Sequence, residues 1–356
     1  MKIGIDISQV AYEGTGVARY VHSMIDAILE YDSKNEYAFF FSSLRRSLPG
    51  DLEERIKEKH SLVTAKLPPA ALDILWNQAH VYTIEKFIGK QDVYISSDWT
   101  QAPSSAKKVT VVHDLVFMRY PETVHKKILA VQKRRLAYVK KEVDLILADS
   151  QATKDDLVRL LNIQESKIKV LYPAVTIPNP LPKSDLVIPS KKYILSVGKL
   201  EPRKNISRLI EAFEAANLSD TDLLIVGPTG WGDQKMHNSN RIKLLGFVPD
   251  EDLYELYRNA LCFVYPSLYE GFGFPVVEAM ALGCPVATSS TSSLKEISDG
   301  VALQFDPTSV EDIQKKLIEV ASNETTRKKL IEAGKKRTMG FNARNYYKSF
   351  IEAIEL

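Results

Sequence analysis

Short hydrophobic runs alternate along this chain with longer stretches in which apolar residues recur at helical spacing. In the first half, the runs predict strands at Lys2–Ile7, Tyr37–Phe41, Leu62–Lys66, Asp92–Ser96, Val109–His113, Leu145–Asp149 and Ile168–Leu171. Helical patterns cover Gly16–Glu30, Ala70–Phe87, Val124–Lys141 and Gln151–Leu161. Strands that are apolar almost throughout are typical of a parallel sheet covered on both faces. The alternation therefore predicts βαβ units and a doubly wound α/β domain.

A proline-rich stretch interrupts this pattern, which then resumes. Five prolines lie between residues 173 and 192, a density that neither a helix nor a central strand tolerates. The predicted elements that follow are Tyr193–Val197, Asn205–Ala216, Leu223–Val226, Ile242–Leu245, Leu261–Tyr265, Val286–Thr288 and Ala302–Phe305. We expect two Rossmann-like parallel-sheet domains facing a cleft, residues 1–172 and 193–340, joined by the linker 173–192. The last helix, 341–356, is expected to close the first domain.

Composition narrows the class of protein. The chain has 356 residues, of which 45% are hydrophobic and 26% charged, as in an ordinary globular protein of two domains. Its net charge of +2 gives no overall attraction to nucleic acid. Both cysteines lie in apolar segments, which indicates packing rather than a disulfide or zinc site. The start of the chain resembles a strand rather than a signal peptide, and no run is long enough to span a membrane, so we expect a cytoplasmic protein.

The segment 266–285, PSLYEGFGFPVVEAMALGCP, carries the most chemical information. It follows the predicted strand Leu261–Tyr265, so it lies at the carboxyl end of the sheet, where such folds bind ligands. Its glycines allow a ligand to approach the backbone closely, and a helix begins near Pro275, where backbone N–H groups favour an anion. Glu270 and Glu278 are eight residues apart, so both can contact one ligand.

This Glu-x7-Glu arrangement resembles the signature of the family 4 glycosyltransferases, which have the two-domain GT-B fold. Other segments match that family in the same order: VVHDL at 111–115, LADSQATKDDL at 147–157, VGKLEPRKNI at 197–206, LLGFVPDEDL at 244–253, and the closing helix. Together they extend over essentially the whole chain. The version GKLEPRKN resembles the mannosyltransferase-like branch that acts on bacterial surface polysaccharides.

The resemblance implies a retaining hexosyltransferase whose donor is a nucleotide-diphosphate sugar of GDP or UDP type, with no cofactor. The implied acceptor is a glycan, a lipid-linked glycan or a small molecule. By position, Glu278 binds the ribose hydroxyls and Glu270 the hexose hydroxyls, while Arg203 and Lys204 neutralise the diphosphate and His113 lies beside the donor sugar. The other implied donor-site residues are Gly14, Gly16, Asp114, Lys199, Gly227, Val248, Gly271, Phe272, Gly273, Phe274, Pro275, Val276 and Val277.

Negative charge grows on the departing diphosphate, and it can be met by a metal on an Asp-x-Asp motif or by cations and a helix N-terminus. Two such motifs occur, at 220–222 and 250–252. The first precedes a strand, at the wrong end of the sheet, and Asp250 is expected to be the N-cap of a helix. Arg203 and Lys204 follow a strand on the ligand side. We therefore expect a metal-independent site.

Each of these residues also has a purely structural interpretation. His113 can be a packed histidine, and Glu278 a carboxylate in the first turn of a helix, which the helix dipole favours. Arg203 and Lys204 can be surface charges in a turn. Two cations that open a helix oppose its dipole, however, so we expect an anion near them.

The stretch 126–141 carries seven basic residues. A helix of this kind can lie on an anionic membrane at its inner face, or contact a lipid-linked acceptor. The alternative is a solvated face whose apolar side packs on the sheet, and the interspersed charge elsewhere in the chain favours it.

Other functions share the expected two-domain shape, since a fold does not determine an activity. A nucleotide-sugar epimerase or phosphorylase is one alternative, although the chain shows no motif for a pyridoxal lysine. A non-catalytic sugar-binding subunit is another. The joint presence of Glu270, Glu278, Arg203, Lys204 and His113 argues against a site that has lost its activity.

Overall fold

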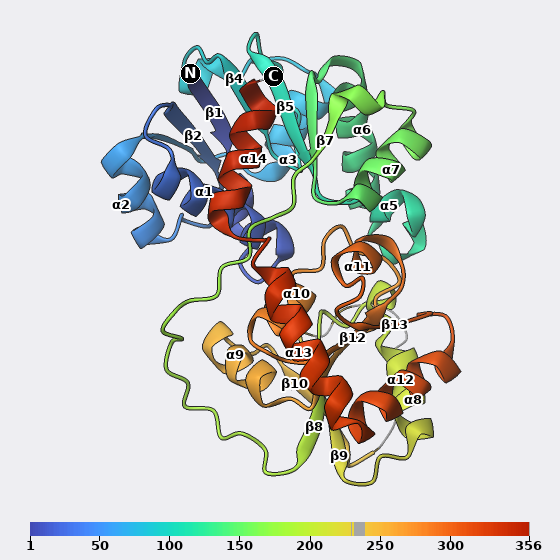
Figure 1. Cartoon of the computed structure of the whole chain (residues 1–356). Helices are drawn as coiled ribbons and strands as arrows, with labels where there is room; N and C mark the ends of the chain where they lie inside the picture. The colour runs from blue at the N-terminus through green and yellow to red at the C-terminus, as the bar shows by residue number, and fades with distance from the viewer. Residues whose placement is uncertain (229, 231–238, 356) are drawn as a thin grey trace. The chain divides into compact units, whose positions relative to one another are not determined.

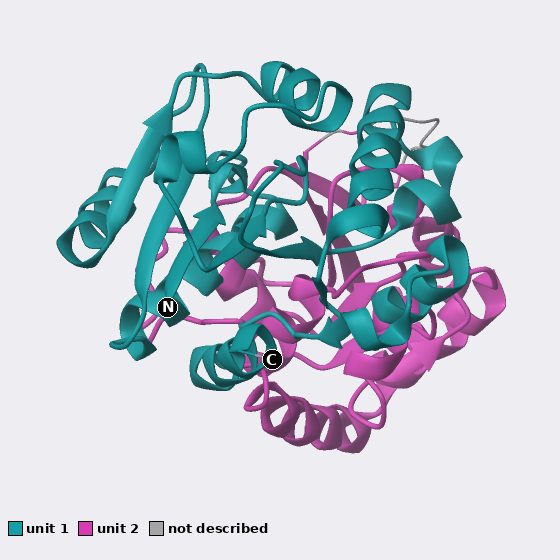
Figure 2. Ribbon diagram, turned by 90° about the horizontal axis from the view of Figure 1, so that it is seen from above, with its two compact units in different colours: residues 1–174, 342–356 teal, residues 175–341 magenta. Residues whose placement is uncertain are grey.

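The computed structural model describes residues 1–228, 230 and 239–355. The chain forms two compact units, shown in Figure 2: unit 1 comprises residues 1–174 and 342–356, and unit 2 comprises residues 175–341. The boundary falls between Ala174 and Val175, so most of the proline-rich stretch belongs to unit 2. Both units are α/β structures with parallel sheets, as the hydrophobic pattern predicts (Figure 1).

Within the described residues, unit 1 holds a seven-stranded sheet in the order β3-β2-β1-β4-β5-β6-β7, with every neighbouring pair parallel. Its strands are β1 (Lys2–Asp6), β2 (Glu36–Ser42), β3 (Ser61–Ala65), β4 (Val93–Ser96), β5 (Lys107–Val112), β6 (Leu145–Ala148) and β7 (Ile168–Val170). Its helical segments are η1 (Ser8–Ala11), α1 (Gly16–Tyr31), α2 (Gly50–Lys59), α3 (Pro69–Leu72), η2 (Asp73–Gln78), α4 (Glu85–Ile88), α5 (Val116–Arg119), η3 (Pro121–Thr123), α6 (Lys126–Glu142), α7 (Gln151–Leu161), η4 (Glu165–Lys167) and α14 (Ala343–Glu355).

The single helix predicted at Ala70–Phe87 is wrong. The segment contains α3, the π-helical η2 and α4, and the chain between them takes positive φ at His80 and Tyr82. Trp76 explains the break, because its fully buried indole donates a hydrogen bond from Nε1 to the Tyr82 carbonyl at 3.0 Å. The helix α2 was not predicted.

Unit 2 has a six-stranded sheet among its described residues, in the order β10-β9-β8-β11-β12-β13, also with parallel neighbours. Its strands are β8 (Lys192–Val197), β9 (Thr221–Val226), β10 (Ile242–Gly246), β11 (Cys262–Tyr265), β12 (Val286–Ser289) and β13 (Leu303–Phe305). Its helical segments are η5 (Pro202–Lys204), α8 (Ile206–Ala216), α9 (Asp250–Asn259), α10 (Phe274–Ala281), α11 (Ser292–Ile297), α12 (Val310–Ser322) and α13 (Glu324–Thr338).

Both cysteines are buried and free, as the apolar segments around them indicate. Cys262 belongs to a hydrophobic core in which α8 and α12 pack on the sheet of unit 2. Burial raises the pKa of the Cys284 thiol well above its usual range. Both thiols are therefore core packing groups.

The loops that follow β8, β9 and β10 pack against one another at the carboxyl end of this sheet. The Gly227 N–H donates to the Gly246 carbonyl at 2.7 Å. A Cβ on Gly227 would come within 2.1 Å of the Gly198 carbonyl oxygen, and the residue has φ +145°. Only glycine fits there, and its absence of a side chain lets the first two loops touch.

Candidate functional site

The loop before α10 is held by hydrogen bonds with η5 and with the first residues of α11. The Leu268 N–H donates to the Arg203 carbonyl at 2.9 Å, and the Glu270 N–H donates to Ser292 Oγ at 3.0 Å. Ser293 Oγ reaches the carbonyls of Glu270 and Phe272, each at 2.9 Å. These contacts fix the backbone on both sides of the Glu270 side chain.

Gly273 ends this loop in the left-handed conformation, with φ +103°, and α10 begins at the next residue. A side chain there would meet Leu294 at 2.7 Å. The glycine therefore permits both the turn and the close approach of α11. The sequence GFGFPVVE thus folds as a tight loop followed directly by a helix, in which Pro275 occupies the first turn.

Arg203, Lys204 and Glu270 form one buried charged cluster in unit 2. Arg203 Nη1 lies 2.8 Å from Glu270 Oε2, and Lys204 Nζ lies 2.7 Å from Glu270 Oε1. Each oxygen of this carboxylate thus has a cation of its own. The three side chains are between 10% and 15% exposed, so water screens these contacts only weakly.

Two further residues, Glu201 and Tyr265, complete the cluster, and neither was predicted from the sequence. Arg203 donates through Nε and Nη2 to Glu201 Oε1, at 3.2 and 2.8 Å. Lys204 Nζ donates to the Tyr265 hydroxyl at 2.6 Å and lies 5.0 Å from the centre of that ring. Glu201 stands two residues before Arg203, so an acid–base pair was visible in the sequence. Tyr265 ends the strand just before the signature segment.

The cluster is electrically balanced. Burial raises the pKa of Glu270, but Arg203 and Lys204 outweigh it and hold that pKa at about 2. Burial also lowers the pKa of Lys204, which Glu270 counteracts. Glu201 also faces Arg203, so two acidic and two basic side chains meet in this cluster. The anion expected near these cations is therefore supplied, at least in part, by the chain itself.

The placement of the two cations at the start of a helix is wrong. They lie in the short 3₁₀ turn η5, which ends at Asn205 in the left-handed conformation, and α8 begins only after it. The argument that the dipole of a helix opposes them therefore fails. Their position at the carboxyl end of β8 is as predicted.

Glu278 lies in the second turn of α10, not in its first, and it is 4% exposed. The helix dipole acts mainly within the first turn, so it does not account for this carboxylate. The other donor positions of unit 2 are distributed over neighbouring loops. Lys199 is exposed after β8, Gly227 follows β9, and Val248 is half-buried after β10.

In unit 1, His113 and Asp149 form a buried pair at the ends of the adjacent strands β5 and β6. His113 Nδ1 lies 2.7 Å from Asp149 Oδ2, and both residues are at least nine-tenths buried. Burial lowers the pKa of His113, but the Asp149 carboxylate and its hydrogen bond reverse this and raise that pKa to about 9. Asp149 was placed in a predicted strand and was not recognised as a site residue.

The remaining unit 1 positions have clear local roles. Gly14 takes φ +76°, and Gly16 is the first residue of α1, whose N-cap Thr15 accepts a hydrogen bond from the Ala18 N–H at 3.2 Å. Asp114 Oδ1 accepts from the Val116 N–H at 2.9 Å and so stabilises the turn into α5.

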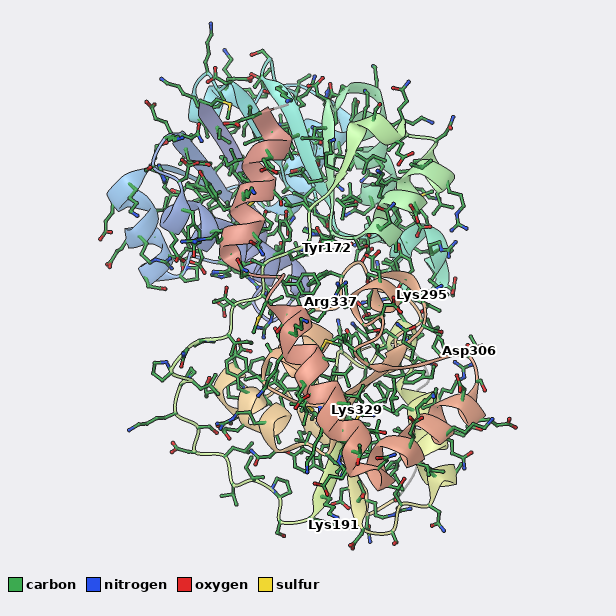
Figure 3. The ribbon with its side chains drawn as sticks, in the orientation of Figure 1. Tyr172, Lys191, Lys295, Asp306, Lys329 and Arg337 are labelled. Atoms are coloured by element: carbon green, nitrogen blue, oxygen red, sulfur yellow. The ribbon has the colours of Figure 1, made fainter. Side chains whose placement is uncertain are left out.

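Neither Asp-x-Asp motif has the surroundings of a metal site. Asp222 is buried at the amino end of β9, where Lys191 and Lys243 each lie 2.8 Å from it. Figure 3 labels Lys191 at the end of unit 2 opposite to Lys295 of α11. Asp250 is the first residue of α9 and not the N-cap, which is Pro249, so that expectation is wrong. Among the described residues, no group of three or more His, Cys, Asp or Glu side chains comes together as metal ligands do.

The basic stretch forms α6, and its charges divide between two sides of the helix. Arg135, counted among the basic residues of this stretch, is 1% exposed and donates to Thr110 Oγ1 and the Val111 carbonyl at 2.8 and 2.7 Å. The exposed residues recur at helical spacing and form the lysine face of α6: Lys126, Lys127, Ala130, Lys133, Ala137, Lys140 and Lys141.

Comparison with known proteins adds to this geometry. A family model described as Glycosyl transferases group 1 matches residues 181–337, and one described as Glycosyltransferase Family 4 matches residues 14–177. O-antigen chain mannosyltransferase B of Escherichia coli is 27% identical over 383 residues, covering 100% of both chains. O-antigen chain mannosyltransferase RfbU of Salmonella typhimurium is 25% identical and covers 85% of this chain and 86% of its own. Anabaena HepE, solved with UDP and glucose, superposes with a TM-score of 0.70 at 17% identity, covering 100% of this chain and 99% of HepE.

Proposed function

Because the chain belongs to the family 4 glycosyltransferases of GT-B fold, we propose that it transfers mannose from a nucleotide-diphosphate sugar. The proposed acceptor is a bacterial surface polysaccharide, and the transfer retains the configuration of the sugar. It is a hexosyltransferase; the donor, the acceptor and the stereochemistry are the proposal. The observation that carries it is the charged cluster of Arg203, Lys204 and Glu270 at the carboxyl end of the unit 2 sheet. The names of the two O-antigen relatives favour mannose.

Bond cleavage between the sugar and the phosphate increases the negative charge on the departing diphosphate. Arg203 and Lys204 are already fixed by the carboxylates around them, so they need little rearrangement to hydrogen-bond that charge. The N-terminus of α10, which no side chain caps, adds its helix dipole and the Phe274 N–H. Pro275 has no N–H, and the N–H groups of Val276 and Val277 donate to the Gly273 carbonyl. Glu270, anchored between the two cations, accepts hydrogen bonds from hexose hydroxyls, and Glu278 accepts them from ribose.

The same cluster supports a metal-independent reaction. Glu201 and Glu270 hold Arg203 and Lys204 as oriented hydrogen-bond donors, and these donors can stabilise the charge of the diphosphate without a metal. The 250–252 motif lies in α9, where Asp252 accepts a hydrogen bond from Ser184 Oγ at 2.6 Å. We expect the nucleotide's own phosphate to take the proton of the acceptor hydroxyl on the face from which it departs.

We also propose that the lysine face of α6 contacts the anionic surface of the membrane that carries a lipid-linked acceptor. Exposed hydrophobic side chains occur in the segment packed beside α6: Ile74, Val81 and Tyr82 are between 51% and 57% exposed. His80 in this segment stacks on Tyr138 of α6 at 3.8 Å. Lysines together with exposed apolar groups are typical of helices that bind at a lipid interface. None of the described helices meets the length and hydropathy needed to cross a bilayer.

A vesicle assay tests the membrane contact. The double variant Lys133→Glu/Lys140→Glu should lose co-sedimentation with vesicles containing phosphatidylglycerol, because it reverses two charges on the exposed face. Lys329→Glu, an exposed lysine of α13, is the control and should bind as the wild type does. Equal binding by all three proteins, or no preference for phosphatidylglycerol over phosphatidylcholine, would contradict the contact.

The donor is tested by a thermal-shift series with GDP, UDP and their sugars. A ligand that binds only the folded chain raises the melting temperature in proportion to RT ln(1 + [L]/Kd). We expect GDP-mannose to give the largest shift and to release GDP when a polyprenyl-linked glycan is added. If none of the nucleotides raises the melting temperature, the donor assignment is overturned. If a nucleotide sugar binds but is not turned over, a non-catalytic sugar-binding subunit is favoured.

A further inference from the structure

His113 and Asp149 are placed side by side by the register of the sheet. Val112 of β5 pairs with Ala148 of β6, and the next residue of each strand supplies one member of the buried pair. The backbone of His113 is also fixed, because Thr153 Oγ1 in the first turn of α7 donates to its carbonyl at 3.1 Å. The 2.7 Å contact thus joins two residues that β5, β6 and α7 hold in place.

The groups around this pair are almost all acidic or neutral. Asp98 and Asp114 add negative charge near the imidazole, and both raise its pKa together with Asp149. Tyr20 of α1 packs its ring edge-on to His113 at 4.7 Å, and its hydroxyl hydrogen-bonds that of Tyr346 of α14 at 2.9 Å. Burial raises the pKa of both tyrosines, so they stay neutral. Arg135 of α6, which is also buried, is paired with Asp98 at 3.2 Å.

The buried carboxylate of Asp149 depends on His113 to compensate its negative charge. Its Oδ2 atom contacts the imidazole, and its Oδ1 atom is buried with no hydrogen-bond partner among the described residues. If the imidazole were neutral, the Asp149 carboxylate would keep only this one hydrogen bond among the described residues, and burial, which raises the pKa of Asp149, would disfavour its charge. Protonation of His113 offsets that effect.

We propose that Asp149 is a positioning residue that keeps His113 protonated through the neutral pH range, so that His113 serves the transfer as a cation and hydrogen-bond donor and not as a base. Since Nδ1 donates to Asp149, the two protonation states differ at Nε2, which carries either an N–H or a lone pair. Only the N–H can stabilise negative charge on a departing diphosphate or donate to a sugar oxygen. This inference rests on the proposed place of His113 beside the donor.

The sign of the pH dependence follows from the direction of the shift. The pKa of His113 is raised from 6.5 to about 9, so the protonated form persists below about 9 and is lost as the pH rises through that value. Without the carboxylate, burial lowers this pKa and is opposed only by the smaller effects of Asp98 and Asp114. Replacing Asp149 should therefore move the loss of the proton from the alkaline range to below the usual value for histidine.

The experiment is an NMR titration of the His113 imidazole in the full chain, with kcat measured over the same pH range. In the wild type, the imidazole resonances should shift near pH 9, and His113→Gln assigns them by their disappearance. In Asp149→Asn, whose amide oxygen can still accept from Nδ1, they should shift below about pH 6.5. Its kcat at pH 7.5 should fall about tenfold or more and recover in part at pH 5.5, with little change in the donor KM.

Tyr346→Phe is the matched control, because it removes a hydroxyl from the same buried group without removing a charge. It should keep the wild-type pH profile. A wild-type imidazole that titrates near 6.5 or below would overturn the inference, as would an Asp149→Asn enzyme with unchanged kcat and pH profile. If Asp149→Asn does not fold, the wild-type titration alone decides. If no donor is turned over, the proposed function fails, whereas the titration still tests whether His113 is protonated.

Discussion

The two units place charge at the carboxyl ends of their sheets in different ways. In unit 2, Arg203 contacts Glu201, Glu270 and the Tyr269 carbonyl, so its position does not depend on one contact. In unit 1, Asp149 contacts His113 through Oδ2, and its Oδ1 atom has no hydrogen-bond partner among the described residues. The first arrangement holds each of its two basic side chains through more than one contact. The charge of the second arrangement depends on one proton, that of the His113 imidazole.

This difference gives each region its own experimental signature. Substitutions in the unit 2 cluster should lower the rate at every pH, because they remove hydrogen-bond donors and leave the His113–Asp149 pair unchanged. Substitution of Asp149 should change the pH at which the rate is lost.

The largest loss is expected when one of the two cations is removed. Hydrogen bonds to charged groups contribute roughly 1.5–3 kcal/mol each, and 1.36 kcal/mol corresponds to a tenfold change in rate. Lys204→Ala should therefore lower kcat by about one to two orders of magnitude, with a smaller rise in KM, because the diphosphate becomes more negative as the bond breaks. Steady-state kinetics with a melting curve for each variant measures this.

Arg203→Ala should cost a similar factor in kcat and also destabilise the fold. Its guanidinium bonds the Tyr269 carbonyl at 2.9 Å as well as two carboxylates, so its loss leaves Glu201 and Glu270 with fewer partners in a buried place. Lys329→Ala, an exposed position in α13, is the control for both variants and should match the wild type. Wild-type kcat in either cluster variant would remove that residue from the catalytic group.

Variants of the two glutamates should differ in their affinity for the free nucleoside diphosphate, measured by calorimetric titration. Glu278→Gln should weaken binding about tenfold, because its expected partner is the ribose. Glu270→Gln should bind the diphosphate at least as tightly as the wild type does, because removal of this carboxylate leaves positive charge on Arg203 and Lys204 for the phosphates. It should still transfer sugar more slowly. Equal losses of affinity in both variants would show that the roles are misassigned.

A smaller effect concerns stability in acid. The pKa of Glu270 is lowered from 4.5 to about 2, so its contribution to folding is complete above about 4.5 and is lost as the pH falls toward 2. The melting temperature of the wild type should therefore fall more steeply between pH 5 and pH 3 than that of Glu270→Gln. Parallel curves for the two proteins would mean that the carboxylate is not held by the cations in solution.

The smallest expected effect is that of metal removal. Donor turnover should persist in excess EDTA, since Arg203, Lys204 and the N-terminus of α10 are assigned the task of neutralising the diphosphate. Rates with and without added manganese should agree within error. A loss of activity in EDTA that manganese restores would contradict the metal-independent model.

Most strands could be predicted from the sequence to within a few residues because buried parallel strands are apolar almost throughout. The broken segment at 70–87 could not, because its break depends on Trp76, whose indole reaches the Tyr82 carbonyl only in the folded core. Its residues have helical spacing on both sides of the break, so the periodicity alone indicates one helix.

The candidate site, too, could be predicted from the sequence only in part. The positions of Arg203 and Lys204 after β8 followed from strand order along the chain, whereas their contact with Glu270, more than sixty residues away, needed the fold. Asp149 illustrates this best. It comes directly after a buried strand, and its meeting with His113 follows once β5 and β6 are known to be neighbours. Sequence identifies which end of the sheet carries the chemistry, and the order of the strands decides which side chains meet.

The most direct test of the central claim is the NMR spectrum of the product formed from GDP-mannose and a polyprenyl-linked glycan acceptor. The account predicts a new α-mannosyl linkage, which retains the configuration of the donor, together with one GDP released per sugar transferred. It predicts the same product, formed at about one to two orders of magnitude lower rate, by Lys204→Ala. A β-linked product, or GDP-mannose that is bound but never transferred by the wild type, would contradict the account.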